Sequence, residues 1–208
     1  MLDQNFIVDN LLLLYLLKEQ EEFSQKKLTK LIFLSELEME KKNLFGFDFH
    51  FVRYRYGPYS FSVPGVKDFL VVNELIDTFI LDIGPFQSHN SSINKHGQVL
   101  LDEFEELFSL NRKVVDQLDL VLDEFGNFSG KRLENICYQI EINGIKIRNI
   151  LPNQTILNPK RNLEKKERFE IDNDWVNTFL LLMDKRNYRQ IKRAIKLNRQ
   201  TIATKYPY

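Results

Sequence analysis

Residues 23–34 read FSQKKLTKLIFL, and this stretch predicts the start of a helix that packs into the core. Ser24 is a good N-cap, because its hydroxyl can accept a hydrogen bond from a free backbone amide of the first turn. Phe23, just before the cap, can pack on Leu28 one turn further along. The apolar positions at helical spacing are Leu28, Leu31, Ile32 and Leu34, and the positions expected to face solvent are Lys26, Lys27 and Lys30.

The segment before this stretch predicts a first helix from near Phe6 to Glu19. Its centre, LLLLYLL at 11–17, is shorter than the ~20 apolar residues that a membrane span needs. Asp3 and Asp9 precede it, where a secretory signal would have basic residues. We therefore expect a helix that is buried on nearly all sides, in a chain that neither enters a membrane nor carries a signal.

The composition predicts a globular protein, since 43% of the 208 residues are hydrophobic and 17 are Phe. Lys and Arg total 29, as do Asp and Glu, so the net charge is zero. This balance gives no long-range attraction to nucleic acid or to a membrane. Cys137 is the only cysteine, which excludes an intramolecular disulfide and suits the reducing cytoplasm.

The capping pattern returns at 118–133, LDLVLDEFGNFSGKRL, where Ser129 again follows a Phe. Both places predict a pair of helices joined by a tight turn, the second pair over 114–140. Convergence on a good helix–helix corner explains this similarity more simply than an internal duplication, although the sequence leaves both open.

A strand is expected between the helix pairs, because Phe47 to Tyr56 alternates and is rich in aromatic residues. Gly57-Pro58 is expected to end it, since proline cannot donate a hydrogen bond to a sheet, and Ser60 or Ser62 can cap the helix that follows. The face expected to pack in the core is Val52, Tyr54 and Tyr56, and the opposite face is Phe51, Arg53 and Arg55.

The next segments predict a helix over 64–75, a strand over 78–83, a turn at Gly84-Pro85, and a helix that opens at 91–97 and runs to about Phe108. A helix, a hairpin and a second helix in this order are typical of a winged helix, with the hairpin as the wing. We therefore expect an α+β protein that is mostly α-helical, with a winged-helix-like core in residues 1–140 and a small sheet.

The C-terminal third differs in character. Residues 141–170 are expected to form a loop-rich connector, and 171–208 a helical extension with an apolar stripe at Trp175, Phe179, Leu180 and Met183. The run 185–205 has eight Lys and Arg and no acidic residue. Such a run could dock on the acidic stretch 102–124, on an acidic partner, or on nucleic acid.

No residue pattern points to catalysis. His50, His89, His96 and Cys137 lack the close spacing of metal ligands, and the chain has neither a Gly-x-Ser-x-Gly elbow nor a phosphate-binding glycine loop. Cys137 falls on an apolar helix face, where thiols are usually inert. We expect no enzyme activity, no cofactor and no metal.

Two motifs in order, KLTKLIFL at 27–34 and YRYGPYS at 54–60, resemble the Panacea domain, also called the SocA-like antitoxin domain. The resemblance covers about residues 6–140, and the Thr-x-x-Gly helix start of that family corresponds here to Asn94-Lys95-His96-Gly97. It implies a non-catalytic binder: an antitoxin that neutralises a cognate toxin, a protease adaptor, or a small subunit of a prokaryotic defence complex. The partner would be a protein encoded nearby.

Exposed aromatic and Arg side chains are the usual anchors of protein interfaces. The candidate partner-binding residues are therefore Arg53, Arg55, Tyr59, Arg189, Lys192, Arg193 and Lys196. The alternative is a winged-helix DNA-binding transcriptional regulator. The helix over 64–75 that would read DNA offers only Lys67, against Asp68 and Glu74, and affinity for DNA rises with the number of phosphates contacted.

Overall fold

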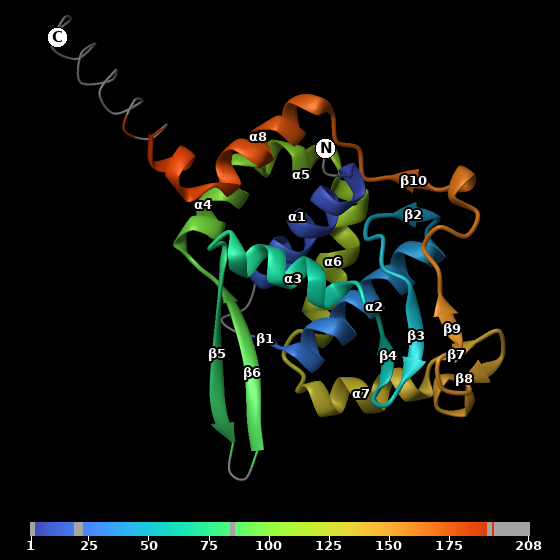
Figure 1. Cartoon of the computed structure of the whole chain (residues 1–208). Coiled ribbons are helices and arrows are strands. Elements are labelled where there is room, and N and C mark those ends of the chain that lie inside the picture. The colour runs from blue at the N-terminus through green and yellow to red at the C-terminus, as the bar shows by residue number, and fades with distance from the viewer. Residues whose placement is uncertain (1–2, 19–22, 84–85, 191–192, 194–208) are drawn as a thin grey trace, which may run out of the picture.

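The computed structural model describes residues 3–18, 23–83, 86–190 and 193. The fold is α+β and mostly helical, with small sheets at its edges (Figure 1). The helices are α1 (Gln4–Lys18), α2 (Gln25–Lys41), α3 (Val63–Val72), α4 (Lys95–Glu103), α5 (Glu105–Leu110), α6 (Arg112–Phe125), α7 (Gly130–Gln139) and α8 (Asn173–Met183), with short 3-10 turns η1 (Ile147–Asn149) and η2 (Leu163–Lys165).

The strands are short apart from one hairpin. They are β1 (Phe23–Ser24), β2 (Leu44–Phe45), β3 (Phe51–Tyr54), β4 (Gly57–Tyr59), β5 (Ile76–Ile83), β6 (Phe86–Ile93), β7 (Glu141–Ile142), β8 (Ile145–Lys146), β9 (Thr155–Leu157) and β10 (Glu167–Arg168). Two sheets are antiparallel and three-stranded, in the orders β1-β6-β5 and β4-β3-β9. The pairs β7-β8 (antiparallel) and β10-β2 (parallel) complete the described ladders.

The core is built around α1, as the run at 11–17 predicts. Its leucines from Leu11 to Leu14, and again Leu16 and Leu17, have no exposed surface. The helix contacts α3, α4, α6, α8 and β6, so apolar side chains all around it find partners. Within the described part of the chain, no helix has both the length and the apolar character of a membrane span.

Both predicted helix pairs are confirmed, and so are their caps. The Ser24 hydroxyl accepts from the Lys27 amide at 3.2 Å, and the Ser129 hydroxyl accepts from the Arg132 amide at 3.2 Å. One position on α2 was predicted wrongly: Lys30, expected at the surface, is only 3% exposed. Its side chain lies between α2 and the β3–β4 hairpin, where a backbone carbonyl receives its ammonium group.

The strand expected over 47–56 is shorter than predicted, because buried carboxylates take the backbone amides that a ladder would use. Asp9 accepts from the Asp48 amide at 2.8 Å, and Glu36 accepts from the Phe49 amide at 3.1 Å. Burial raises the pKa of both carboxyl groups well above their ordinary values. Residues 47–50 are thus anchored by side chains of α1 and α2, and regular pairing begins only at Phe51.

The expectation that Gly57-Pro58 ends the strand is also wrong. The chain turns at 55–56, and Gly57 begins β4 with a φ of 88°, a value that favours glycine. Pro58 lies opposite Arg53 in the ladder. Proline is tolerated there because β4 is the edge strand of its sheet. Ser62 takes the N-cap position of α3, although its side chain makes no capping bond.

The hairpin predicted after the helix over 64–75 is confirmed. Its first strand begins at Ile76 rather than at 78, and its second strand reaches Ile93, so residues 91–93 belong to β6 and not to the start of the next helix. The helix after it begins at a real cap, since the Asn94 side chain accepts from the amides of His96 and Gly97 at 3.0 and 3.1 Å. This helix does not run unbroken to Phe108. It breaks at Phe104, whose ring packs against Trp175 at 5.3 Å between centroids.

Residues 141–170 contribute to the edges of the fold. Strand β9 pairs with β3, and β10 pairs with β2. Ile156, Leu157 and Phe169 belong to the core cluster. The helix predicted around Trp175 is α8, which buries Val176, Phe179 and Leu182.

Candidate functional site

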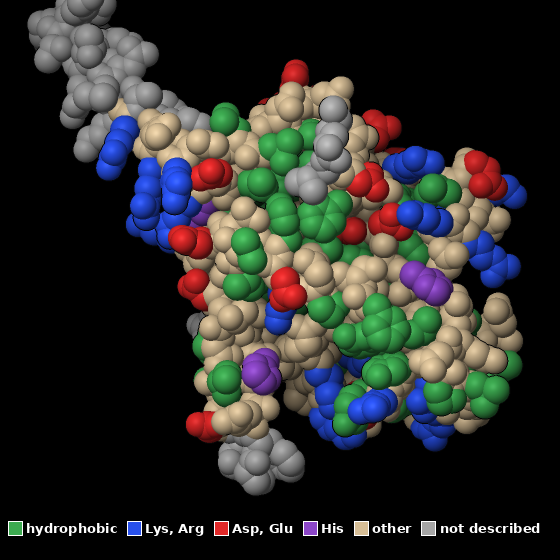
Figure 2. Space-filling model, viewed as in Figure 1, with side chains coloured by type: hydrophobic (Ala, Val, Ile, Leu, Met, Phe, Trp, Pro, Cys, Tyr) green, Lys and Arg blue, Asp and Glu red, His purple; other side chains and the backbone are tan. Residues whose placement is uncertain are grey.

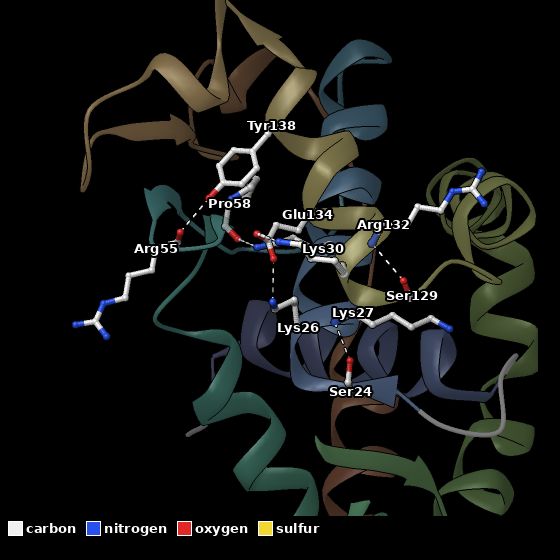
Figure 3. Close-up of polar contacts among 11 residues, drawn as sticks. Ser24, Lys26, Lys27, Lys30, Arg55, Pro58, Ser129, Arg132, Glu134 and Tyr138 are labelled. Carbon is white, nitrogen blue, oxygen red and sulfur yellow. Dashed lines mark hydrogen bonds and ion pairs between the residues drawn. The ribbon is translucent and has the colours of Figure 1, made fainter. Parts of the chain in front are cut away.

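The turn of the β3–β4 hairpin is held from behind by two helices. The Lys30 ammonium of α2 donates to the Pro58 carbonyl at 2.5 Å, and the Tyr138 hydroxyl of α7 donates to the Arg55 carbonyl at 2.9 Å. Figure 3 shows both side chains reaching the hairpin, while the Arg55 guanidinium points away from it. The two sequence motifs, the helix at 27–34 and the turn at 54–60, therefore meet in space.

Behind the hairpin, the side chains of Lys30 and Cys137 are buried, and that of Glu134 is both buried and ion-paired. Burial lowers the pKa of Lys30 to about 8 and raises the pKa of the Cys137 thiol to about 12. Glu134, itself buried, pairs with Lys26 at 2.8 Å and with Lys131 at 3.0 Å. A thiol with so high a pKa is not a nucleophile near neutral pH. The Lys30 side chain of this cluster holds the hairpin through the Pro58 carbonyl.

The burial of Lys30 makes stability depend on pH. Between pH 8 and 10.5 the unfolded chain still binds the proton that the folded chain has released, so Lys30 makes the stability rise with pH in this window. Lys30→Met removes that contribution. The unfolding free energy of the wild type relative to Lys30→Met is expected to increase by about 2 kcal/mol from pH 7 to pH 9.5. Urea denaturation at the two pH values measures it, and a constant difference would contradict a buried, charged Lys30.

Aromatic side chains form the outer surface of the hairpin. The rings of Tyr54, Tyr59 and Phe61 lie 5.1 to 5.6 Å apart between centroids, and Phe61 is 65% exposed. Tyr56 is 58% exposed, with the Lys26 ammonium 4.4 Å from its ring centroid. Figure 2 shows hydrophobic side chains gathered over β3 and β4, with Lys and Arg side chains beside them.

The prediction that the tyrosine face packs in the core is therefore wrong for Tyr56, and Tyr54 is only half-buried. Val52 is buried, as predicted, and Phe51 from the opposite face also enters the core, with its ring 5.3 Å from that of Phe33 on α2. The reason is that helix α2 covers the other side of the strand, which leaves the tyrosines toward solvent.

Two candidate arginines flank these rings. Arg53 is half-buried: one terminal nitrogen donates to the Tyr54 carbonyl at 3.0 Å, and its guanidinium lies 5.8 Å from the ring centroid of Tyr138. Arg55 is exposed and lies 5.8 Å from the Tyr54 ring. Among the described residues, no carboxylate pairs with either guanidinium. We call Arg53, Tyr54, Arg55, Tyr56, Tyr59 and Phe61 the hairpin face.

The basic C-terminal candidates lie elsewhere. Arg189 and Arg193 are exposed, and Figure 1 places this segment at the opposite end of the molecule from the β3–β4 hairpin. Lys192 and Lys196 lie outside the described residues. Lys185 pairs with Glu74, just after α3, so the described part of the run does not dock on the acidic stretch 102–124. The structure thus places Arg53, Arg55 and Tyr59 on one hairpin, apart from the basic run. Arg55 lies beside the Tyr54 ring, which contacts Tyr59, whereas Arg53 lies toward Tyr138 on the other side of β3.

Sequence reasoning missed Phe61, and the signal was present: a large aromatic residue between two serines, just before a helix start, is unlike a core position. The sequence shows no metal-ligand spacing around His96, and a surface position would be the ordinary place for such a histidine. It is buried instead, with its Nε2 2.9 Å from the Leu182 carbonyl and its ring 5.2 Å from that of Tyr188. Within the ranges that the structure describes, no group of three or more His, Cys, Asp or Glu could hold a metal ion.

Comparison with known proteins adds no identification: no protein-family model matches the chain, and no curated protein matches it. The function must therefore be inferred from the side chains of the site. What these offer is a rigidly held hairpin with exposed aromatic rings and unpaired guanidinium groups, which suits binding to another macromolecule.

Proposed function

We propose that this protein is a non-catalytic protein–protein interaction module, antitoxin-like, which acts in the cytoplasm. It binds and neutralises a cognate toxin, or serves as a small subunit of a prokaryotic defence complex. The observation that carries the proposal is the hairpin face, where three exposed or half-exposed aromatic rings lie within 5.6 Å of one another, with Arg55 beside the ring of Tyr54. Tyr and Arg are the residue types that dominate interface energetics.

The way the hairpin is held supports this proposal. Lys30 and Tyr138 fix its backbone at Pro58 and Arg55 on both sides of Gly57. A surface that is already ordered loses little entropy on association, so its contacts contribute fully to affinity. A loop that only joined two elements would not need two buried or half-buried polar side chains to hold its carbonyls.

The arrangement of the core supports the likeness to a winged helix and to the Panacea family. The chain order is α1, β1, α2, then β2, β3 and β4, then α3, and the β5–β6 hairpin that follows would be the wing. Strand β1 pairs with β6, with Phe23 opposite Ser91, so the first strand joins the wing in one sheet. The two sequence motifs contact each other through Lys30 and Pro58, so one structural feature explains the presence of both.

DNA binding is the second candidate, and the exposed Arg186, Arg189 and Arg193 favour it. The winged-helix surfaces do not. Helix α3 has Lys67 and Asp68 as its only charges, and the wing from 76 to 93 has two aspartates and no Lys or Arg. A regulator should retard its own promoter fragment with steep salt dependence. Reversing the charges of Arg189, Lys192 and Arg193 should abolish the shift, and binding that survives excludes the basic run as the reader.

Co-expression with each adjacent gene product tests the proposed function. We expect one neighbour to co-purify with the tagged chain in a fixed stoichiometry through gel filtration. If the neighbour is a toxin, its growth inhibition should be relieved by the chain. Absence of a complex with every neighbour would contradict the proposal.

A further inference from the structure

A pocket of about 470 Å³ lies beside the hairpin face, lined by Arg53, Asn135, Tyr138, Gln139 and Arg148. Three separate elements meet there: β3, the C-terminal half of α7, and η1. Its volume falls in the range of ligand pockets, roughly 300–1,000 Å³. The fold thus brings together two arginines that are far apart in the sequence.

The lining supplies hydrogen-bond donors and positive charge. Arg53 and Arg148 contribute guanidinium groups, and Asn135 and Gln139 contribute carboxamides that can donate. No acidic residue lines the pocket. The Nε of Arg53 is buried and has no hydrogen-bond partner within the described chain, although one of its terminal nitrogens is held by the Tyr54 carbonyl. The Arg53 guanidinium thus keeps a donor that no acceptor of the described chain occupies.

Arg148 completes the pocket from η1. It is exposed, and no carboxylate of the described residues pairs with it. Guanidinium groups bind carboxylates through two parallel hydrogen bonds, with both geometric selectivity and strength. Tyr138 connects the pocket with the hairpin: its side chain lines the pocket, and its hydroxyl donates a hydrogen bond to the Arg55 carbonyl.

We propose that this pocket receives the carboxylate of a Glu or Asp side chain that the proposed protein partner presents beside the hairpin. The inference rests on the proposed function. A protein carboxylate is favoured over a nucleic-acid phosphate because Arg53 and Arg148 are the only cations among the described residues that line the pocket. Nucleic-acid affinity needs several phosphate contacts, whereas one buried carboxylate can anchor a protein interface.

The test is a titration of the full chain followed through the Nε–Hε NMR signals of arginine. The probes are an acetylated tetrapeptide with two adjacent glutamates, the matched peptide with two glutamines, and inorganic phosphate. We expect saturable shifts of the Arg53 and Arg148 signals with the glutamate peptide alone. Arg148→Gln should weaken binding about tenfold or more, as expected for loss of a charged hydrogen bond. Arg161→Gln, also exposed but outside the pocket, is the matched control and should bind as the wild type does.

Four results would each overturn the assignment: no saturation with the glutamate peptide, equal shifts with the glutamine peptide, tighter binding of inorganic phosphate, or unchanged affinity in Arg148→Gln. Because the titration does not use the natural partner, its failure is separate from failure of co-purification. If the complex forms although the pocket does not bind the glutamate peptide, the proposed function stands and only this inference is wrong.

Discussion

Gly97→Ala is expected to lower the free energy of unfolding by about 3 kcal/mol, the upper part of the range for forcing extra atoms into a packed core. A Cβ at this position would lie 2.2 Å from the carbonyl oxygen of Leu75 and 2.8 Å from Ile93. The Leu75 carbonyl cannot easily retreat, because it accepts from the Asn94 amide at 3.2 Å. The added methyl would therefore push α4 away from Leu75, which lies between α3 and β5.

Gly65→Ala provides the matched control for this change. Gly65 is also helical, in α3, yet no atom lies within 4 Å of where its Cβ would be. Alanine there should stabilise the fold by about 0.5–1 kcal/mol, since it restricts the unfolded chain. Chemical denaturation of the three proteins gives both values. A loss below 1 kcal/mol in Gly97→Ala would mean that the close approach of α4 to Leu75 is not as described.

Phe61→Ala is expected to weaken the complex with the partner by roughly 30- to 1,000-fold, the 2–4 kcal/mol typical of a central aromatic anchor. Phe61 is 65% exposed and packs only on Tyr54 and Tyr59 among aromatic rings in the described chain. Its removal should leave the fold intact, because little of its surface is buried. Isothermal titration with the co-purified partner measures the dissociation constant.

Leu120→Ala is the control for Phe61→Ala. Leu120 is a comparable exposed apolar side chain, 55% exposed, but it lies on α6 away from the hairpin. We expect its affinity for the partner to stay within about twofold of the wild type, as most residues outside an interface centre do. Equal losses in the two variants would show that general surface hydrophobicity, rather than the hairpin face, governs binding.

The helices of this fold could be predicted from local chemistry. Ser24 and Ser129 cap helices by accepting hydrogen bonds from amides within the first turn. The leucines of 11–17 lie on every side of their helix, so no face of it is suited to contact with water. Each of these signals depends only on a few neighbouring residues, so the local structure that it predicts agrees with the folded structure. The β5–β6 hairpin was predictable for the same reason, because Gly84-Pro85 is a turn signal in the sequence.

Features that depend on distant residues could not be predicted in this way. In the sequence Lys30 has the spacing of a surface lysine, and only the fold brings the Pro58 carbonyl to its ammonium group. The strand at 47–56 is shortened by Asp9 and Glu36, which lie on helices that precede it in the chain. In both cases a tertiary hydrogen bond overrides a local pattern.

The candidate site was predictable only in part. Arg53, Arg55 and Tyr59 were identified from the residue types of the hairpin; Arg55 and Tyr59 both lie beside the Tyr54 ring, whereas Arg53 lies toward Tyr138. The alternation that placed the tyrosines in the core failed, because it could not reveal which face of β3 helix α2 would cover. The Arg148 side of the pocket comes from a segment with no periodic signal, so sequence spacing could not bring it to Arg53.

The most direct measurement of the central claim is amide hydrogen–deuterium exchange of the chain alone and in complex with its co-purified partner. We predict that binding slows exchange in residues 53–63, which contain the hairpin face, and in 135–149 around the pocket, while the β5–β6 hairpin is unchanged. Protection confined to the β5–β6 hairpin or to the basic run from 185 onward, with none in residues 53–63, would contradict the assignment of the hairpin face as the binding surface.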